Sequence, residues 1–268
     1  MRAVGSLGED AVAGGAIVAG DTAASWLVTL GGRPQSHVDL AEPTRLAFDY
    51  VRRVADVLDA LAPAGERLAV LHVGGAGLTL PRYVAVTRPA SRQVVLEPDA
   101  ELTALVREHA PLPRRSGIKV RDVDGRTGLT AIRDASFAAC VVDAFDAEGR
   151  TPPELLTLEA LAEYARVLDG GCVIVNLRDS APHRLARDVV AAAELAFDVV
   201  AVGGEPATWK GRRDGNLLLV ASTDASAGRA LAAAARSRAA PYRLLAGDSL
   251  RDALGGGTPR RDGGAPST

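Results

Sequence analysis

Short apolar segments alternate with amphipathic helical patterns along most of the 268-residue chain. The apolar segments are predicted to be buried strands, at residues 68–73, 93–97, 118–122, 138–143 and 172–177. The segments with apolar residues at helical spacing are predicted to be helices, at residues 80–86, 100–109, 158–168 and 185–195. Strands that are apolar on both faces and alternate with helices form parallel sheets that helices cover on both sides. The pattern therefore predicts an α/β domain.

The last two predicted strands break this alternation. Residues 197–202 and 216–221 are joined by a polar, glycine-rich stretch without a helical pattern. Two strands joined without a crossover pair antiparallel. We therefore expect a mostly parallel, seven-stranded sheet that ends in an antiparallel C-terminal hairpin. This arrangement resembles the Rossmann-like fold of the S-adenosylmethionine-dependent methyltransferases.

Turn and boundary residues organise the rest of the chain. Residues 25–30 and 35–39 flank a Gly-Gly-Arg-Pro turn and predict a β-hairpin, and a helix follows over residues 44–61. The expected division is a flexible N-terminal segment (1–24), the β-hairpin with its linking helix (25–62), the Rossmann-like domain (63–222), and a C-terminal helix near residues 231–236 with a disordered tail (223–268).

Composition and charge exclude several classes of protein. The chain is 47% hydrophobic, which allows a sizeable core, and its net charge of −2 lacks the basic excess of a nucleic-acid-binding protein. It has no apolar run of membrane-spanning length, and its beginning lacks the pattern of a secretory signal. The two cysteines form no disulfide framework, and no Cys/His cluster predicts a metal site. We expect a cytoplasmic protein that binds neither nucleic acid nor a membrane.

A nucleoside site is predicted where the first strands of the sheet end. Gly74, Gly75 and Gly77 follow the first strand, where small residues allow a ligand to approach the backbone. Glu97 ends the second strand, where a carboxylate can accept both hydroxyls of a ribose, and Asp124 follows the third, where it can meet an adenine amino group. The alternative for the glycine segment is a tight strand-to-helix turn. The alternative for Asp124 is a solvent-exposed Asp-Gly turn. A dinucleotide site is less well supported, because Leu80 stands where the third fingerprint glycine belongs.

A pair of carboxylates marks the end of the fourth strand. Asp143 lies at the strand tip, and Asp146 follows three residues later. Such an anionic pocket suits a cation, and a carboxylate there can accept a proton from an amine that must attack carbon. The alternative is a capping or ribose-binding aspartate. His72, inside the first strand, is expected to be a packed core histidine.

Several motifs resemble the spermidine synthase (polyamine aminopropyltransferase) family, in that family's order. They are residues 32–36 (GRPQS), 48–50 (FDY), 71–75 (LHVGG), 79–80 (TL), 95–97 (VLE), 123–125 (VDG), 142–146 (VDAFD), 156–157 (LT) and 170–171 (GG). The resemblance implies that decarboxylated S-adenosylmethionine donates an aminopropyl group to putrescine or another polyamine, without a tightly bound cofactor. It also implies a homodimer.

By position, the resemblance carries roles over to individual residues. The donor is expected to contact Gly74, Gly75, Gly77, Glu97, Asp124 and Asp143. Asp143 would also activate the amine. Gln35, Tyr50 and Asp146 would help to hold the polyamine, and residues 147–156 would close over the site.

The chain also departs from the family's motifs. The loop that usually reads Gly-Gly-Gly-Asp-Gly-Gly is GGAGLT at residues 74–79, so its aspartate is absent. The usual Tyr-His-Glu is Tyr50-Val51-Arg52, and an inward-pointing Arg52 would repel a polyamine. Ala147 stands where proline is common. Three hypotheses therefore remain open: an aminopropyltransferase, a methyltransferase that uses S-adenosylmethionine, and a non-catalytic adenosyl-binding protein.

Overall fold

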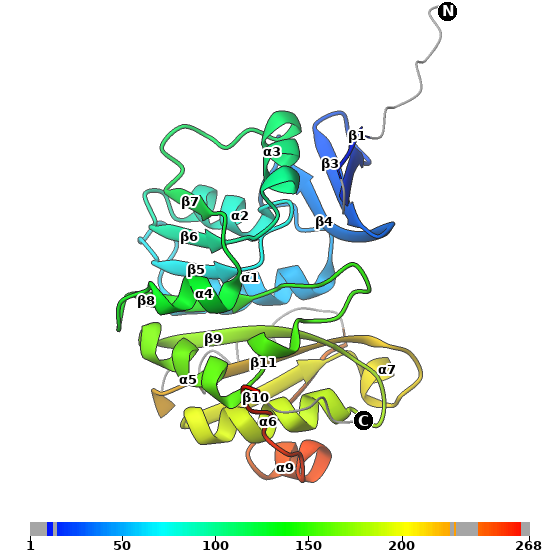
Figure 1. Ribbon diagram of the computed structural model, residues 1–268, viewed down its shortest axis with the longest axis vertical. Helices are drawn as coiled ribbons and strands as arrows, with labels where there is room; N and C mark the ends of the chain where they lie inside the picture. The colour runs from blue at the N-terminus through cyan, green and yellow to red at the C-terminus, as the bar shows by residue number, and fades with distance from the viewer. Residues whose placement is uncertain (1–9, 13–14, 226–227, 229–240, 264–268) are drawn as a thin grey trace, which may run out of the picture.

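The computed structural model describes residues 10–12, 15–225, 228 and 241–263 of the chain. Its N-terminal part is an antiparallel sheet of four strands (Figure 1). The strands follow one another in sequence order: β1 (Asp10–Ala11), β2 (Gly15–Ala19), β3 (Ser25–Leu30) and β4 (Arg33–Asp39).

The second, central sheet contains eight strands in the order β12-β10-β11-β9-β8-β5-β6-β7. Strands β5 to β9 pair in parallel, whereas β11, β10 and β12 are antiparallel to their neighbours. Their bounds are β5 (Val70–Val73), β6 (Gln93–Leu96), β7 (Ile118–Arg121), β8 (Phe137–Val142), β9 (Leu168–Asp179), β10 (Val199–Gly204), β11 (Gly215–Ser222) and β12 (Arg243–Ala246). This is the predicted Rossmann-like methyltransferase fold, with one strand more than the seven expected.

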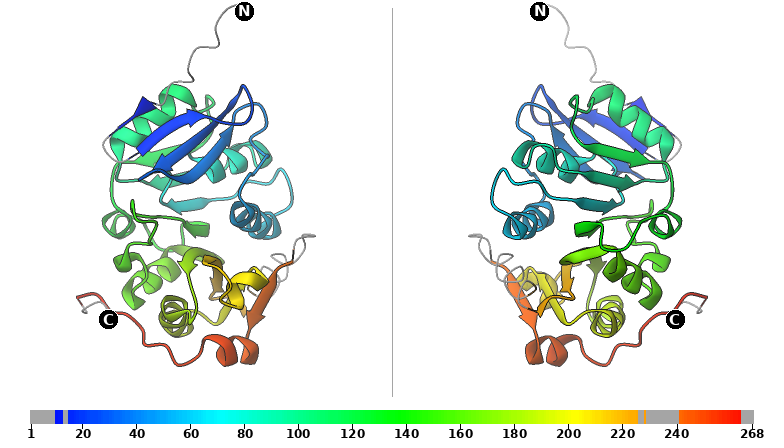
Figure 2. Two further views of the ribbon diagram at one scale, coloured as in Figure 1. Left: turned by 90° about the vertical axis from the view of Figure 1, so that its right-hand side faces the viewer. Right: turned by 90° about the vertical axis from the view of Figure 1, so that its left-hand side faces the viewer.

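Helices cover both faces of the central sheet (Figure 2), as the doubly apolar strands require. One face packs against α1 (Asp49–Leu61) and α2 (Thr79–Thr87). The other packs against α4 (Gly125–Thr130), α5 (Leu158–Val167), α6 (Arg184–Ala196) and α9 (Asp248–Leu254). Two short helices, η1 (Pro153–Leu155) and α7 (Pro206–Trp209), lie in connections.

The N-terminal sheet is joined to the rest by α3 (Ala100–His109), which follows β6. Leu102 and Val106 of this helix pack against Ile17 and Val28 of the small sheet. Asp99 caps the helix, because its side chain accepts a hydrogen bond from the Leu102 N–H at 2.8 Å. The small sheet is therefore held over the carboxyl ends of the central strands.

The direction of winding reverses between β5 and β8, and this reversal places the site. The chain runs from β5 outward to β7 and then returns to β8 on the other side of β5. At the crossing point Gly74 has φ +87°, and a Cβ atom there would lie 2.4 Å from the Asp143 carbonyl oxygen. Only glycine allows this close approach of the two strand ends.

The prediction of a flexible segment through residue 24 is wrong for residues 15–24. Strand β2 pairs with β3 from Gly15 to Ala19, so the expected hairpin is part of a larger sheet. Ile17 is 1% exposed and packs onto α3. Three of the five residues of this strand are glycine or alanine, so the sequence does not show a clear apolar strand pattern there.

The prediction of a disordered C-terminal tail is wrong for residues 254–263. Strand β12 pairs with β10 and supplies the eighth strand, and α9 follows it. Arg260 and Asp262 then bind the first turn of α5 through backbone and side-chain hydrogen bonds. The helix expected near residues 231–236 lies outside the described residues. Within the described part of the chain, no helix is long and apolar enough to cross a membrane.

Candidate active site

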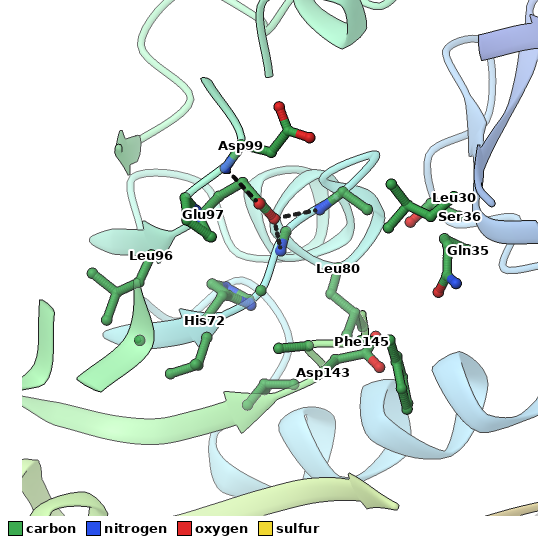
Figure 3. A pocket seen from close by; sticks show the side chains of 18 of the residues that line it. Leu30, Gln35, Ser36, His72, Leu80, Leu96, Glu97, Asp99, Asp143 and Phe145 are labelled. Atoms are coloured by element: carbon green, nitrogen blue, oxygen red, sulfur yellow. Dashed lines mark hydrogen bonds between the residues drawn. The ribbon is translucent and has the colours of Figure 1, made fainter. Parts of the chain in front are cut away.

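A cavity of about 380 Å³ opens at the reversal point of the central sheet (Figure 3). Its floor is formed by the ends of β5, β6 and β8, and its other walls come from β4, the start of α1 and the segment after β8. Of the predicted site residues, the cavity brings together Gly74, Gly75, Glu97, Asp124, Asp143, Gln35 and Tyr50.

Glu97 holds the glycine loop in place from the end of β6. One carboxylate oxygen accepts hydrogen bonds from the N–H groups of Gly75 (2.9 Å) and Ala76 (3.1 Å), and the other accepts from Asp99 N–H (3.1 Å). A carboxylate has about four acceptor positions, so about one remains for a ligand hydroxyl. Glu97 therefore shapes the loop as well as lining the cavity.

Asp124 lies on the same side of the cavity, after β7. Its side chain accepts a hydrogen bond from the Thr127 N–H at 2.9 Å and caps α4, a helix that the sequence analysis missed. These hydrogen bonds from Thr127 lower the pKa of Asp124, so the group is ionised at neutral pH. Asp124 therefore caps the helix with its carboxylate and is also one of the residues that line the cavity.

Asp143 lies at the tip of β8, on the other side of the glycine loop from Glu97. It accepts hydrogen bonds from the Tyr50 hydroxyl at 3.3 Å and from Asn176 Nδ2 at 2.9 Å. Burial raises the pKa of Asp143 to about 6, although these two donors act in the opposite direction. Burial and the Asp143 charge also raise the pKa of Tyr50, so the phenol remains a donor. Asp143 is thus oriented by two donors and titrates close to neutral pH.

Asn176 and His72 belong to the site, although the sequence analysis gave neither a role there. Asn176, on β9, is 1% exposed, and its Oδ1 is a buried acceptor without a partner. A lone amide inside an apolar strand was the signal that could have identified it. His72 is buried, as predicted, and it also lines the cavity. Burial lowers the pKa of His72 to about 4, and the neutral ring hydrogen-bonds to Gln93 at 3.0 Å.

Two predicted site residues do not line the cavity. Gly77 is buried under the N-terminal sheet, where a Cβ atom would meet Ser36 Cβ at 2.7 Å and Val38 Cγ2 at 2.9 Å. Asp146 is bound to Arg150, whose backbone N–H (2.8 Å) and Nε (3.1 Å) both reach its carboxylate. Spacing alone could not show which way these residues face in an irregular loop.

Arg52 also points away from the cavity. Its guanidinium donates hydrogen bonds to the carbonyl oxygens of Leu46 and Ala47, both at 2.7 Å, and to Asp49 at 3.3 Å. The repulsion that an inward-pointing Arg52 would cause is therefore absent from this site.

The segment after β8 covers the cavity and contacts the β3–β4 turn. Arg33 Nη1 donates to the Glu148 carbonyl oxygen at 2.6 Å, and a Cβ on Gly31 would lie 2.7 Å from the Ala147 carbonyl oxygen. The segment expected to close the site is thus joined to the N-terminal sheet in this structure.

The charged side chains that line the cavity are all acidic. They are Glu97, Asp99, Asp124, Asp143 and Glu154. Among the described residues, no lysine or arginine contributes to the lining. The cavity therefore favours a cationic ligand over one that carries a carboxylate. No group of three metal-binding side chains was found in the described parts of the chain.

Several solved structures are similar to this chain. A probable spermidine synthase from Corynebacterium glutamicum is 29% identical, with a TM-score of 0.84, over 97% of this chain and 98% of that one. Human methyltransferase-like protein 13, solved in complex with SAH, is 18% identical over 72% and 94% of the two chains, with a TM-score of 0.56. A spermidine synthase in complex with the transition-state analogue AdoDATO is 13% identical over 84% and 75%, with a TM-score of 0.59. No protein-family model and no curated protein sequence matches the chain.

The fold and the position of the cavity define a protein of the Rossmann-like methyltransferase superfamily. Within that superfamily, the near full-length match to the Corynebacterium protein shows a closer relationship. The chain is a divergent, spermidine synthase-like member of the superfamily.

Proposed function

We propose that this protein transfers the aminopropyl group of decarboxylated S-adenosylmethionine to an amine. The observation that carries the proposal is that all of the charged residues in the described lining of the cavity are acidic. This donor has a sulfonium and an ammonium group but no carboxylate, whereas S-adenosylmethionine has a carboxylate that would find no cationic side chain in the described lining. The similar structures support the choice, because one is a probable spermidine synthase and another is a spermidine synthase.

The nucleoside of the donor would lie beside Gly74, Gly75 and Glu97. In this proposal the free acceptor position of Glu97 takes a ribose hydroxyl, and Asp124 lies beside the adenine. The SAH and AdoDATO complexes of the neighbours support an adenosyl ligand at this place in the fold. The sulfonium would then lie between the glycine loop and Asp143.

Asp143 would act as the base that prepares the amine. The entering ammonium gives one proton to the carboxylate, and the neutral nitrogen attacks the propyl carbon next to sulfur. A C–N bond forms as the C–S bond breaks, and the bonding electrons pass to sulfur. The products are methylthioadenosine, which is neutral, and a protonated secondary amine, so the charge balances. Asp143 then releases its proton to water.

The competing hypotheses predict a different order of ligand affinities. A methyltransferase binds S-adenosylhomocysteine more tightly than methylthioadenosine, since it must hold the amino-acid carboxylate. We expect the opposite order here, by about tenfold or more, because that carboxylate would lie among acidic groups. Calorimetric titration of both nucleosides measures this order, and tighter binding of S-adenosylhomocysteine would exclude aminopropyl transfer as the best assignment.

Turnover is tested by release of methylthioadenosine from decarboxylated S-adenosylmethionine in the presence of amines. We expect release with the native protein and a loss of at least about 100-fold in Asp143→Asn, the range that general-base catalysis contributes. Absence of release from the native protein with every amine would leave the methyltransferase and the non-catalytic hypotheses, which the order of nucleoside affinities distinguishes. The homodimer and the cytoplasmic location stay predictions.

A further inference from the structure

We propose that the acceptor of this site is an amine with a single ammonium group on an apolar body, and not a diamine or polyamine. The inference rests on the proposed aminopropyl transfer and concerns the part of the cavity on the Asp143 side of the glycine loop. Figure 3 shows Gln35 and Leu30 on the side of the cavity opposite Glu97. An acceptor that approaches Asp143 must occupy this part, because the nucleoside fills the other.

The walls of this acceptor end are mainly apolar and aromatic. They are formed by Leu30, Phe48, Tyr50, Val51, Leu80, Phe145 and Ala147, with Gln35, Ser36 and Thr79 as neutral polar groups. Among the described lining residues, Asp143 is the carboxylate on this side. The other four lie beyond the glycine loop: Glu97 and Asp99 follow β6, Asp124 follows β7, and Glu154 lies in η1, which packs against α4.

The two positions that might have supplied a second carboxylate do not supply one. Asp146 is engaged by Arg150 through two hydrogen bonds outside the cavity. At Gly77 the N-terminal sheet occupies the space that a side chain would need, with Ser36 Cβ 2.7 Å from an added Cβ. At the position of the missing aspartate, the small sheet therefore fills the space beside the loop.

The acidic groups beyond the acceptor wall are separated from Asp143. The rings of Phe48 and Tyr50 stack with centroids 6.1 Å apart and lie between the cavity and a second hollow of about 440 Å³. In that hollow, Asp49 pairs with Arg52 at 3.3 Å and with Arg53 at 3.5 Å, and Glu205 pairs with Arg213. Asp214 is exposed to water. A short diamine anchored at Asp143 gains no enclosed ionic partner from these groups.

A second ammonium group in the acceptor end would lose water without gaining an ionic partner. Uncompensated burial of a charge is strongly unfavourable, whereas an alkyl or aryl group in the same place buries apolar surface against Leu30, Leu80 and Phe48. The geometry therefore discriminates between a methyl group and an ammonium group at the far end of the acceptor.

The test uses pairs of amines of equal length. n-Pentylamine replaces one nitrogen of putrescine by a methyl group, and n-hexylamine does the same for cadaverine. We expect kcat/KM for methylthioadenosine release to be at least about tenfold higher with each monoamine than with its diamine, since even part of a charge-burial penalty has this effect. Equal or better use of the diamines overturns the inference and leaves aminopropyl transfer intact.

If no amine supports turnover, the proposed function fails separately. The affinity of n-pentylamine and putrescine for the protein saturated with methylthioadenosine, measured by calorimetry, then decides the preference of the cavity. Tighter binding of n-pentylamine supports the apolar acceptor end, and tighter binding of putrescine overturns it.

A charge placed in the wall gives an independent test. Gln35→Glu changes an amide of the lining into a carboxylate with almost the same shape, whereas Gln35→Met is a neutral control of similar length. We expect the putrescine-to-pentylamine ratio of kcat/KM, or of affinity, to rise about tenfold in Gln35→Glu and to stay low in Gln35→Met. An unchanged ratio in Gln35→Glu would show that wall charge does not set the acceptor class.

Discussion

The environment of Asp143 suits a group that takes up and releases a proton. Its carboxylate is held by Tyr50 and Asn176, and burial brings its pKa to about 6. The Oδ1 atom of Asn176 has no partner when Nδ2 donates to the carboxylate. A rotation of the amide by half a turn would present Oδ1 to a protonated Asp143. Asn176 can therefore hydrogen-bond to both protonation states, which keeps the carboxyl group in place as it gains or loses a proton.

Asp143 should also make the protein less stable as the pH rises. Its folded-state pKa of about 6 lies above the ordinary value of 3.8, so the folded protein binds more protons than the unfolded chain between these values. The free energy of unfolding therefore falls as the pH increases from 4 to 6, by on the order of 2 kcal/mol. Asp143→Asn cannot ionise and should lack this decline.

Urea unfolding at several pH values between 4 and 7 measures the effect. The difference in unfolding free energy between native protein and Asp143→Asn should change across this range in favour of the variant. Asp146→Asn, in the same segment but bound to Arg150, serves as control and should lack this change. A pH profile of Asp143→Asn parallel to that of the native protein would contradict the burial of this charge.

The directions of the side chains at strand ends were predictable, but those of Gly77 and Asp146, further into the loops, were not. Glu97 and Asp143 end buried parallel strands, and the shared edge of such strands fixes where their side chains meet. Gly77 and Asp146 lie in irregular segments, where no periodicity relates sequence to direction. Asp146 turns to Arg150, and Gly77 faces the small sheet, because of contacts made only in the folded chain.

At the scale of elements, the segment after β8 that covers the cavity is held by the β3–β4 turn of the small sheet. We expect Arg33→Ala to loosen the segment after β8, because the variant loses the hydrogen bond from Arg33 to the Glu148 carbonyl oxygen. A hydrogen bond to a charged group contributes about 1.5–3 kcal/mol, so trypsin cleavage after Arg150 should become about threefold faster or more. Position 33 precedes Pro34, so the substitution removes no efficient trypsin site.

Limited proteolysis with mass analysis follows this cleavage. Arg133→Ala, which changes another exposed arginine, should leave the rate after Arg150 unchanged. Equal rates of cleavage in Arg33→Ala and the native protein would show that the turn does not hold the cover.

The elements of the central sheet follow from the sequence more fully than the elements around it. The predicted strands and helices of the sheet are present because burial on both faces leaves an uninterrupted apolar pattern. Strand β12 is four residues long and buries one of them, and α4 is six residues long, so neither is long enough to show a hydrophobic period. The helix predicted from residue 44 begins at Asp49, since residues 39–45 form hydrogen-bonded turns around Asp39.

At the scale of the whole molecule, residues 255–263 form a strap that joins three helices. Thr258 N–H donates to Asp188 of α6 at 2.9 Å, and the Arg260 carbonyl oxygen accepts from Leu158 N–H at the start of α5. Asp262 accepts from the Thr157 hydroxyl at 2.7 Å and pairs with Arg126 of α4. Arg126 adjoins Gly125, which lines the cavity next to Asp124. The C-terminal strap thus connects the far side of the fold to the rim of the site.

We expect Asp262→Ala to lower the free energy of unfolding by about 1–2 kcal/mol, because it removes a hydrogen bond to the helix cap Thr157 and an ion pair with Arg126. Thermal unfolding should show a decrease in Tm of about 2–8 °C. The affinity for methylthioadenosine should also fall slightly, since α4 carries both Arg126 and the rim residue Gly125.

The matched control is Asp248→Ala, whose side chain is 92% exposed and pairs with Arg251 within one helix. That variant should change Tm by less than about 2 °C. Equal effects of the two substitutions would mean that the strap lies on the surface without stabilising it.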